Sequence, residues 1–131
     1  MSYINECTLL GNLGADPVLK THKEGLISCR FSLATTENNN TSWHNVIAWG
    51  KLAEVIHHYM EKGDKLYVRG RIQYYKYKNK EGVLVYKTEI VAQSIKIIRT
   101  KKFIESDPPA EVREAIEAAE AVGDATESPQ F

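Results

Sequence analysis

The chain has too few cysteines for a disulfide framework or a cysteine-rich metal site. Cys7 and Cys29 are the only two in 131 residues, and they fit no zinc spacing. Both lie in strand-like segments, which predicts reduced side chains that pack as small hydrophobic groups. The sequence has no run of about 18 apolar residues and no basic start followed by an apolar block. We therefore expect neither a membrane span nor a secretory signal, and the simplest location is the cytoplasm.

Residue patterns that are typical of catalysis or cofactor binding are also missing. The Trp-Gly-Lys segment at 49–51 lacks the upstream glycine and the following Ser/Thr of a phosphate-binding loop. His57 and His58 are adjacent in a predicted helix and cannot share one face. His22 lies in a polar stretch without an obvious partner. With no Ser/His/Asp or paired-carboxylate arrangement to identify, we expect a protein that is not an enzyme and has no metal or cofactor.

Charge is plentiful, but it is divided along the chain. Residues 1–104 carry sixteen Lys/Arg against nine Asp/Glu, and residues 105–131 carry one Arg against eight acids. This predicts a basic domain at 1–104 and an acidic C-terminal tail at 105–131, in which the Ala/Glu-rich stretch 110–122 forms a short amphipathic helix. The division is typical of a polyanion binder whose tail competes for the binding surface or recruits a partner. The alternative is an ordinary domain with a solvated acidic extension.

Hydrophobic periodicity in the body predicts short strands and a single helix. Residues 51–60 have apolar positions at i, i+3, i+4 and i+7, which is one helical stripe. Strand-like patterns cover residues 8–10, 27–34, 43–49, 65–77, 83–91 and 94–99. The sequence thus predicts an all-β fold, a five-stranded Greek-key barrel of the OB type with one α-helix between strands 3 and 4. Periodicity alone leaves other small β-barrels open.

The segment 65–77 has a face that is too charged for a core yet carries three tyrosines. Basic side chains pair with phosphates, and aromatic rings stack on unpaired bases with about 1–3 kcal/mol per base. The alternative is that these tyrosines cover neighbouring strands or an oligomer interface. We expect Tyr74 on the opposite, buried face. The candidate DNA-binding residues of this segment and of the predicted hairpin tip at 78–82 are Arg69, Arg71, Tyr75, Lys76, Tyr77, Lys78 and Lys80.

The segment 43–49 allows two interpretations. Trp43 and Trp49 share one face, and six residues of about 3.3 Å rise place them roughly 20 Å apart. They are either two stacking platforms for one extended strand or part of the core. The other face, which carries Val46 and Ala48, would suit the narrow interior of a small barrel.

Several short motifs occur in an order that is highly specific in combination. They are GNLGADP at 11–17, FSLAT at 31–35, WHNVI at 43–47, WGKLAE at 49–54, KGD at 62–64 and YVRGR at 67–71. Over about residues 1–100 the chain resembles the bacterial-type single-stranded DNA-binding proteins, which bacteriophages and mitochondria also encode. The resemblance implies an OB fold, a homotetramer or a dimer, and binding of single-stranded DNA without sequence preference.

The resemblance also implies roles for individual residues. Trp43, Trp49 and Tyr77 match positions that stack on bases, which favours an exposed tryptophan face. His44 matches a residue of the family's subunit interface, and Tyr67 lies near it. The loop at 37–42 is short and lacks the aromatic that many relatives have there. The chain ends Glu-Ser-Pro-Gln-Phe, so Pro129 and Phe131 are the candidate contacts to replication and repair proteins, with a spacing that differs from the family's.

We therefore expect a protein that coats single-stranded DNA in replication, recombination or repair, in the bacterial nucleoid or in a host cytoplasm if a phage encodes it. A related OB module for replication restart or RNA binding is the first alternative. A structural protein whose aromatics are buried in subunit contacts is the second.

Overall fold

The computed structural model describes residues 2–99 and 116–117, and within them six strands and one α-helix follow one another. A 3₁₀ turn, Lys23–Gly25, separates the second and third strands. The elements are β1 Cys7–Leu13, β2 Val18–Thr21, β3 Ile27–Glu37, β4 Asn40–Trp49, α1 Gly50–Tyr59, β5 Lys65–Lys78 and β6 Leu84–Arg99. In this part of the chain, no helix is both long and apolar enough to cross a bilayer.

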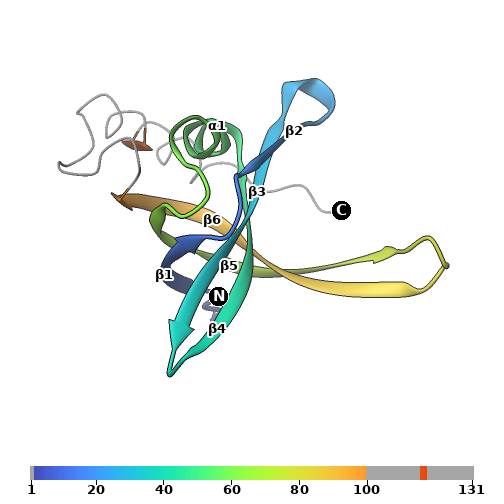
Figure 1. The fold of residues 1–131 in the computed structure, drawn as a ribbon. Helices are drawn as coiled ribbons and strands as arrows, with labels where there is room; N and C mark the ends of the chain where they lie inside the picture. The colour runs from blue at the N-terminus through green and yellow to red at the C-terminus, as the bar shows by residue number, and fades with distance from the viewer. Residues whose placement is uncertain (1, 100–115, 118–131) are drawn as a thin grey trace.

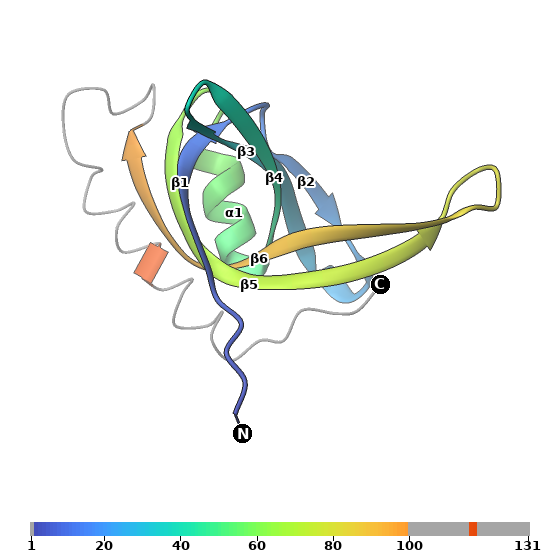
Figure 2. The ribbon, with the colours of Figure 1, turned by 90° about the horizontal axis from the view of Figure 1, so that it is seen from below.

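Five of these strands close into a barrel in the order β1-β5-β6-β4-β3, and β1 then pairs with β3. β4 and β6 run parallel, and the other pairs are antiparallel. Helix α1 lies at one end of this barrel, between its third and fourth strands in chain order (Figures 1 and 2). The predicted OB-type barrel is confirmed. The short β2, which pairs with β3 at the sheet edge, was not predicted.

One hydrophobic cluster fills the barrel. It takes inward-facing residues of the five barrel strands and adds the helical stripe of α1, in which Leu52, Val55 and Ile56 are buried. On β4 the inward residues are Val46 and Ala48, so the tryptophan-bearing face of this strand points outward. The strand-contributed core residues are Leu13, Cys29, Phe31, Leu33, Val46, Ala48, Leu66, Val68, Ile90, Ala92, Ile95 and Ile97.

Both cysteines pack as predicted. Cys29 is fully buried within the cluster, and Cys7 is half-buried against it; both are free thiols. Burial disfavours the charged thiolate and raises the pKa of Cys29 to about 11. Cys29 is therefore a small, unreactive hydrophobic residue.

The structure corrects two expectations about loops and faces. The loop expected at residues 37–42 is a tight hairpin instead, with β3 and β4 joined by Asn38 and Asn39 at φ 51° and 66°, the left-handed values of a two-residue turn. Tyr74 is 78% exposed rather than buried. The reason is that β5 leaves the barrel after Ile72 and β6 joins it only at Ile90, so the segments between them project as a two-stranded ribbon with no core behind it (Figures 1 and 2).

Most of the predicted tail lies outside the described residues, including Pro129 and Phe131 and the boundary at 104/105. Ile116 and Glu117 are helical, inside the stretch for which a helix is predicted. Ile116 is buried and belongs to the core cluster.

Candidate nucleic-acid interface

Residues on the outer side of four strands adjoin one another across the sheet, with Ile47, Glu89 and Val91 buried at the centre and the others at least partly exposed. The register pairs Arg30 with Ile47 across β3 and β4, and Ile47 with Val91 across β4 and β6. Val91 in turn pairs with Arg71 on β5. We call this surface the outer aromatic face. Its members are Arg30 and Ser32 of β3, Trp43, Asn45, Ile47 and Trp49 of β4, Arg71, Gln73, Tyr75 and Tyr77 of β5, and Val85, Lys87, Glu89 and Val91 of β6.

Trp43 is the most open ring of the barrel part of this face, with 62% of its surface exposed. One edge of the indole lies against Gly14, where a Cβ atom would come within 3.0 Å of the ring atom Cε3. Gly14, from the GNLG motif, thus makes room for the ring. A largely exposed indole is suited to stacking on an unpaired base.

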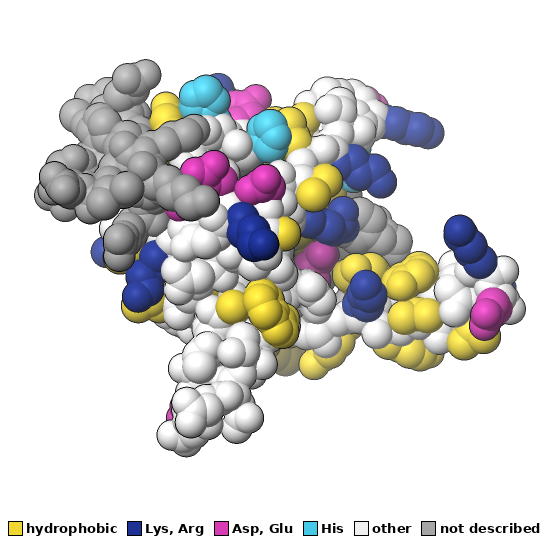
Figure 3. Space-filling view, in the orientation of Figure 1, with side chains coloured by type: hydrophobic (Ala, Val, Ile, Leu, Met, Phe, Trp, Pro, Cys, Tyr) yellow, Lys and Arg dark blue, Asp and Glu magenta, His cyan; other side chains and the backbone are white. Residues whose placement is uncertain are grey.

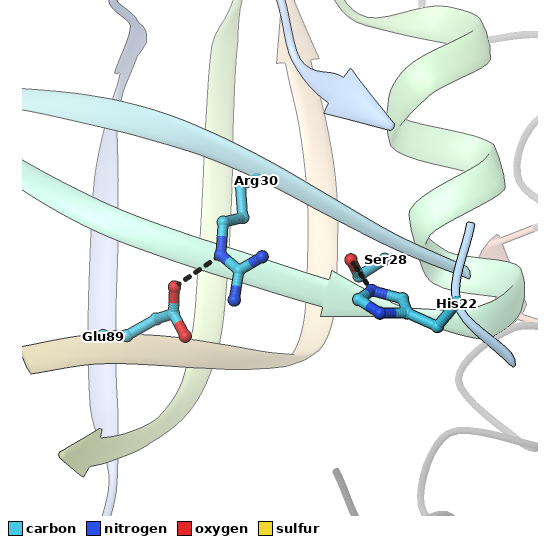
Figure 4. Close-up of polar contacts among 4 residues, drawn as sticks. All are labelled: His22, Ser28, Arg30 and Glu89. Carbon is cyan, nitrogen blue, oxygen red and sulfur yellow. Dashed lines mark hydrogen bonds and ion pairs between the residues drawn. The ribbon is translucent and has the colours of Figure 1, made fainter. Parts of the chain in front are cut away.

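Trp49 is held more tightly. Its ring is half-buried, and the His22 ring lies 5.1 Å away at an interplanar angle of 37°. A hydrogen bond of 2.8 Å between His22 Nε2 and Ser28 Oγ fixes that imidazole (Figure 4). Ser28 pairs directly with Trp49 in the β3–β4 register. His22 therefore packs against one side of Trp49. Residue patterns could not predict this contact, because β2 and the 3₁₀ turn position His22.

An ion pair crosses the centre of the face. Arg30 Nε donates to Glu89 Oε2 at 3.1 Å, and the two side chains are 34% and 2% exposed (Figure 4). The other carboxylate oxygen, Oε1, is buried and makes no hydrogen bond within the described residues. Sequence reasoning missed this pair. The visible signal was Arg30 itself, a charged residue at an outward position of the alternating segment 27–34.

On the ribbon, Tyr75 and Tyr77 lie side by side with ring centroids 6.3 Å apart and an interplanar angle of 27°. Lys87, directly opposite Tyr75, places its Nζ 5.9 Å from the centre of the Tyr77 ring. Lys87 was not among the predicted site residues, although it completes the aromatic and basic character of this part of the face. Figure 3 shows hydrophobic and Lys/Arg side chains gathered on the ribbon.

The remaining predicted basic residues do not all lie on the outer aromatic face. Lys76 and Lys78 alternate with the tyrosines and point to the opposite side of the ribbon, while Lys80 is exposed in the hairpin turn. Arg71 lies on the face, 3.5 Å from the Gln73 side-chain oxygen. Arg69 lies towards β1, and its Nη1 is 3.7 Å from a Glu6 carboxylate oxygen.

The two predicted interface residues lie away from the centre of this face. His44 is half-buried, and its Nε2 shares a hydrogen bond of 2.8 Å with Thr35 Oγ1. Tyr67 lies under the Lys96 ammonium group at 5.9 Å and directly opposite Leu10, which is 53% exposed. An exposed leucine beside a half-buried tyrosine gives this part of the β1–β5 sheet an apolar surface.

The architecture defines the class of protein. A five-stranded barrel closed through a parallel β4–β6 pair, with one helix between its third and fourth strands, is an OB fold. The model of the single-strand binding protein family matches residues 4–98, and the chain belongs to that family. The predicted resemblance is thus confirmed.

Curated relatives agree with this assignment. A single-stranded DNA-binding protein of Xanthomonas campestris pv. campestris is 42% identical over 104 residues, which cover 72% of this chain and 60% of the relative. The protein of the same description from Bacteroides thetaiotaomicron is 35% identical over 109 residues, covering 75% and 68%. That from Neisseria meningitidis serogroup A is 38% identical over 104 residues, covering 72% and 60%. This chain therefore spans about three fifths of the length of the first of these relatives.

Proposed function

We propose that this protein binds single-stranded DNA without sequence preference and coats it during replication, recombination and repair, as a non-catalytic protein of the bacterial nucleoid or of a host cytoplasm. The observation that carries the proposal is the outer aromatic face, where Trp43, Tyr75 and Tyr77 share one surface with Arg71 and Lys87. Family membership and the names of the relatives support it.

The chemistry of the face explains why binding would be indifferent to sequence. Every base has a π-face, so a stacking ring accepts any of them, whereas sequence is read through hydrogen bonds to base edges. Arg71 and Lys87 supply the positive charge that attracts the phosphates. Stacking requires unpaired bases, so the same surface should discriminate against duplex DNA.

Trp43→Ala tests this proposal most directly. We expect oligo-dT to quench the tryptophan fluorescence of the wild type. The substitution should weaken binding by about 1–3 kcal/mol, or roughly ten- to hundredfold, because it removes one base stack. Tyr3→Ala is a matched control, since Tyr3 is 81% exposed in the segment before β1 and should be dispensable. Equal affinity of the wild type for oligo-dT and duplex, or tighter binding of RNA, would contradict the proposal.

We also propose that the chain assembles as a homotetramer, or as a dimer, through the surface that contains His44 and Tyr67. The exposed apolar side chain of Leu10 beside Tyr67 supports an interface there. Sedimentation equilibrium measures the number of chains directly, and a monomer would exclude this proposal.

For the tail we propose that its eight acids compete with DNA for the basic body, and that Pro129 and Phe131 contact replication and repair proteins. Exchanging those acids for their amides keeps Ile116 in the core and removes only charge. We expect tighter binding of oligo-dT at low salt and little change at high salt, where screening is strong. The competitor role fails if the low-salt affinity is unaltered. Deleting Phe131 alone should spare DNA binding and abolish any partner contact.

A further inference from the structure

The core cluster of the barrel contains a residue from the C-terminal part of the chain. Ile116 is 9% exposed and belongs to the same cluster as the strands and α1. Its neighbour Glu117 is also helical, but it is exposed. The two residues therefore occupy the inner and outer positions of an amphipathic helix. The match to the family model ends at residue 98, so this contact lies beyond the part of the chain that the family model describes.

The place of this helical segment in the fold is well defined. Residues 116–117 lie beside α1 and the C-terminal part of β6, on the side of the barrel away from the ribbon (Figures 1 and 2). The stripe of α1 belongs to the cluster, as do Ile95 and Ile97 near the end of β6 at Arg99. Ile116 thus extends the apolar cover that α1 gives to this end of the barrel. Short helices are marginal in water, so burial of an apolar side chain is what stabilises this one.

A fixed point at Ile116 divides the C-terminal part of the chain into two segments of different freedom. Residues 100–115 are held at both ends, by Arg99 of β6 and by Ile116. The 14 residues 118–131 are attached at one end only. Fully extended, they would span about 46–50 Å, which exceeds the roughly 30 Å diameter of a small domain. The second segment is therefore long enough to reach the outer aromatic face from the far side of the barrel.

The acidic residues fall unequally on the two segments. Four of them precede Ile116 and three follow Glu117. The inner acids are Glu105, Asp107, Glu111 and Glu114, and the outer acids are Glu120, Asp124 and Glu127. Pro129 and Phe131 also lie in the outer segment.

We propose that Ile116 anchors the C-terminal part of the chain to the barrel beside α1, so that the folded unit extends to at least Glu117 and only residues 118–131 form a free tail. The consequence for DNA rests on the proposed function. The outer acids, although fewer, are the ones that compete with DNA for the outer aromatic face, because the inner acids are confined near α1 and the end of β6.

Ile116→Ser tests the anchor, and Glu117→Ser is its matched control. Both substitutions place serine at neighbouring helical positions, so they differ chiefly in the burial of the side chain that is lost. We expect Ile116→Ser to lower the thermal midpoint by at least about 4–8 °C, and Glu117→Ser to leave it nearly unchanged. Hydrogen exchange locates the effect. The amides of residues 116–117 should be protected in the wild type and in the control, and should exchange rapidly in Ile116→Ser.

Two results of these measurements would overturn the anchor. One is an equal thermal midpoint for the two serine variants, which would mean that burial of Ile116 contributes nothing to the fold. The other is protection that disappears when the wild type is diluted until its chains separate. In that case Ile116 would be buried against a second copy of the chain and not against its own barrel.

Exchange of the acids for their amides tests the division of the tail. One variant changes the four inner acids and another changes the three outer acids. By charge alone, the inner exchange should tighten oligo-dT binding more at low salt. With the anchor we expect the reverse order, and in an Ile116→Ser background the inner exchange should gain effect. An inner exchange that equals or exceeds the outer one in the wild type would overturn the division.

Failure of the proposed function would be visible separately. If neither exchange alters the affinity of a wild type that binds oligo-dT, the competitor role fails, and the thermal midpoints and hydrogen exchange still decide whether Ile116 is an anchor. A wild type that does not bind oligo-dT at all would refute the proposed function, whatever the serine variants show.

Discussion

Gly70→Ala should destabilise the barrel by about 3 kcal/mol, a large share of the roughly 5–15 kcal/mol that holds a small domain folded. An added Cβ at this position would overlap the carbonyl oxygen of Val91, and it would lie 2.9 Å from the Val91 carbonyl carbon and 3.2 Å from Ala92 Cα. All three are backbone atoms of β6, the strand that pairs with β5 at this point. They cannot move aside without breaking the ladder that closes the barrel.

Gly82→Ala is the matched control for this prediction. Gly82 has a φ of 77° in the hairpin turn, and a Cβ there would meet nothing within 4 Å. The Gly82→Ala substitution should therefore lower stability only by the cost of placing alanine in the left-handed region of backbone conformation, about 1–2 kcal/mol. Denaturant unfolding of both variants separates the two causes. Equal denaturant midpoints for the two variants would contradict the prediction, because they would mean that the β5 and β6 backbones can move apart at Gly70 without a large loss of stability.

Much of the barrel was predictable, because the alternation of residues along each strand shows which side chains share a face. Alternation in residues 27–34 and 65–72 assigns every side chain to one of two sides, and the helical stripe in 51–60 is equally clear. Alternation does not say where a strand leaves the barrel. Tyr74 continues the inward pattern of β5, yet it is exposed because the sheet has already passed the end of the core.

The candidate site was predictable to a similar extent. The outer aromatic face contains Trp43, Arg71, Tyr75 and Tyr77, as the alternation of residues along β4 and β5 predicted. Local pattern could not reveal which strands become neighbours. Arg30 meets Glu89 across 59 positions of sequence, and Lys87 reaches Tyr77 only through the β5–β6 register. His22 reaches Trp49 because β2, four residues with no buried side chain, folds back on β3.

Removing one partner of the Arg30–Glu89 ion pair should destabilise the fold more than removing both partners. Arg30→Met retains an apolar stem over Ile47 but leaves the Glu89 carboxylate, 2% exposed, without its cationic partner. Breaking a buried pair in this way costs about 3–5 kcal/mol, and the 34% exposure of Arg30 should lower that to about 2–3 kcal/mol.

The double variant Arg30→Met/Glu89→Leu should recover most of this loss, because two apolar side chains then replace a desolvated charge whose oxygen Oε1 has no hydrogen-bond partner among the described residues. Denaturant unfolding of the wild type, both single variants and the double variant gives the coupling free energy between the two positions. Additive effects would mean that the pair contributes nothing as a pair. Binding of oligo-dT by the stable double variant then distinguishes two roles for Arg30. Unchanged affinity would assign Arg30 to neutralising Glu89, whereas a reduced salt slope would assign it to a phosphate contact as well.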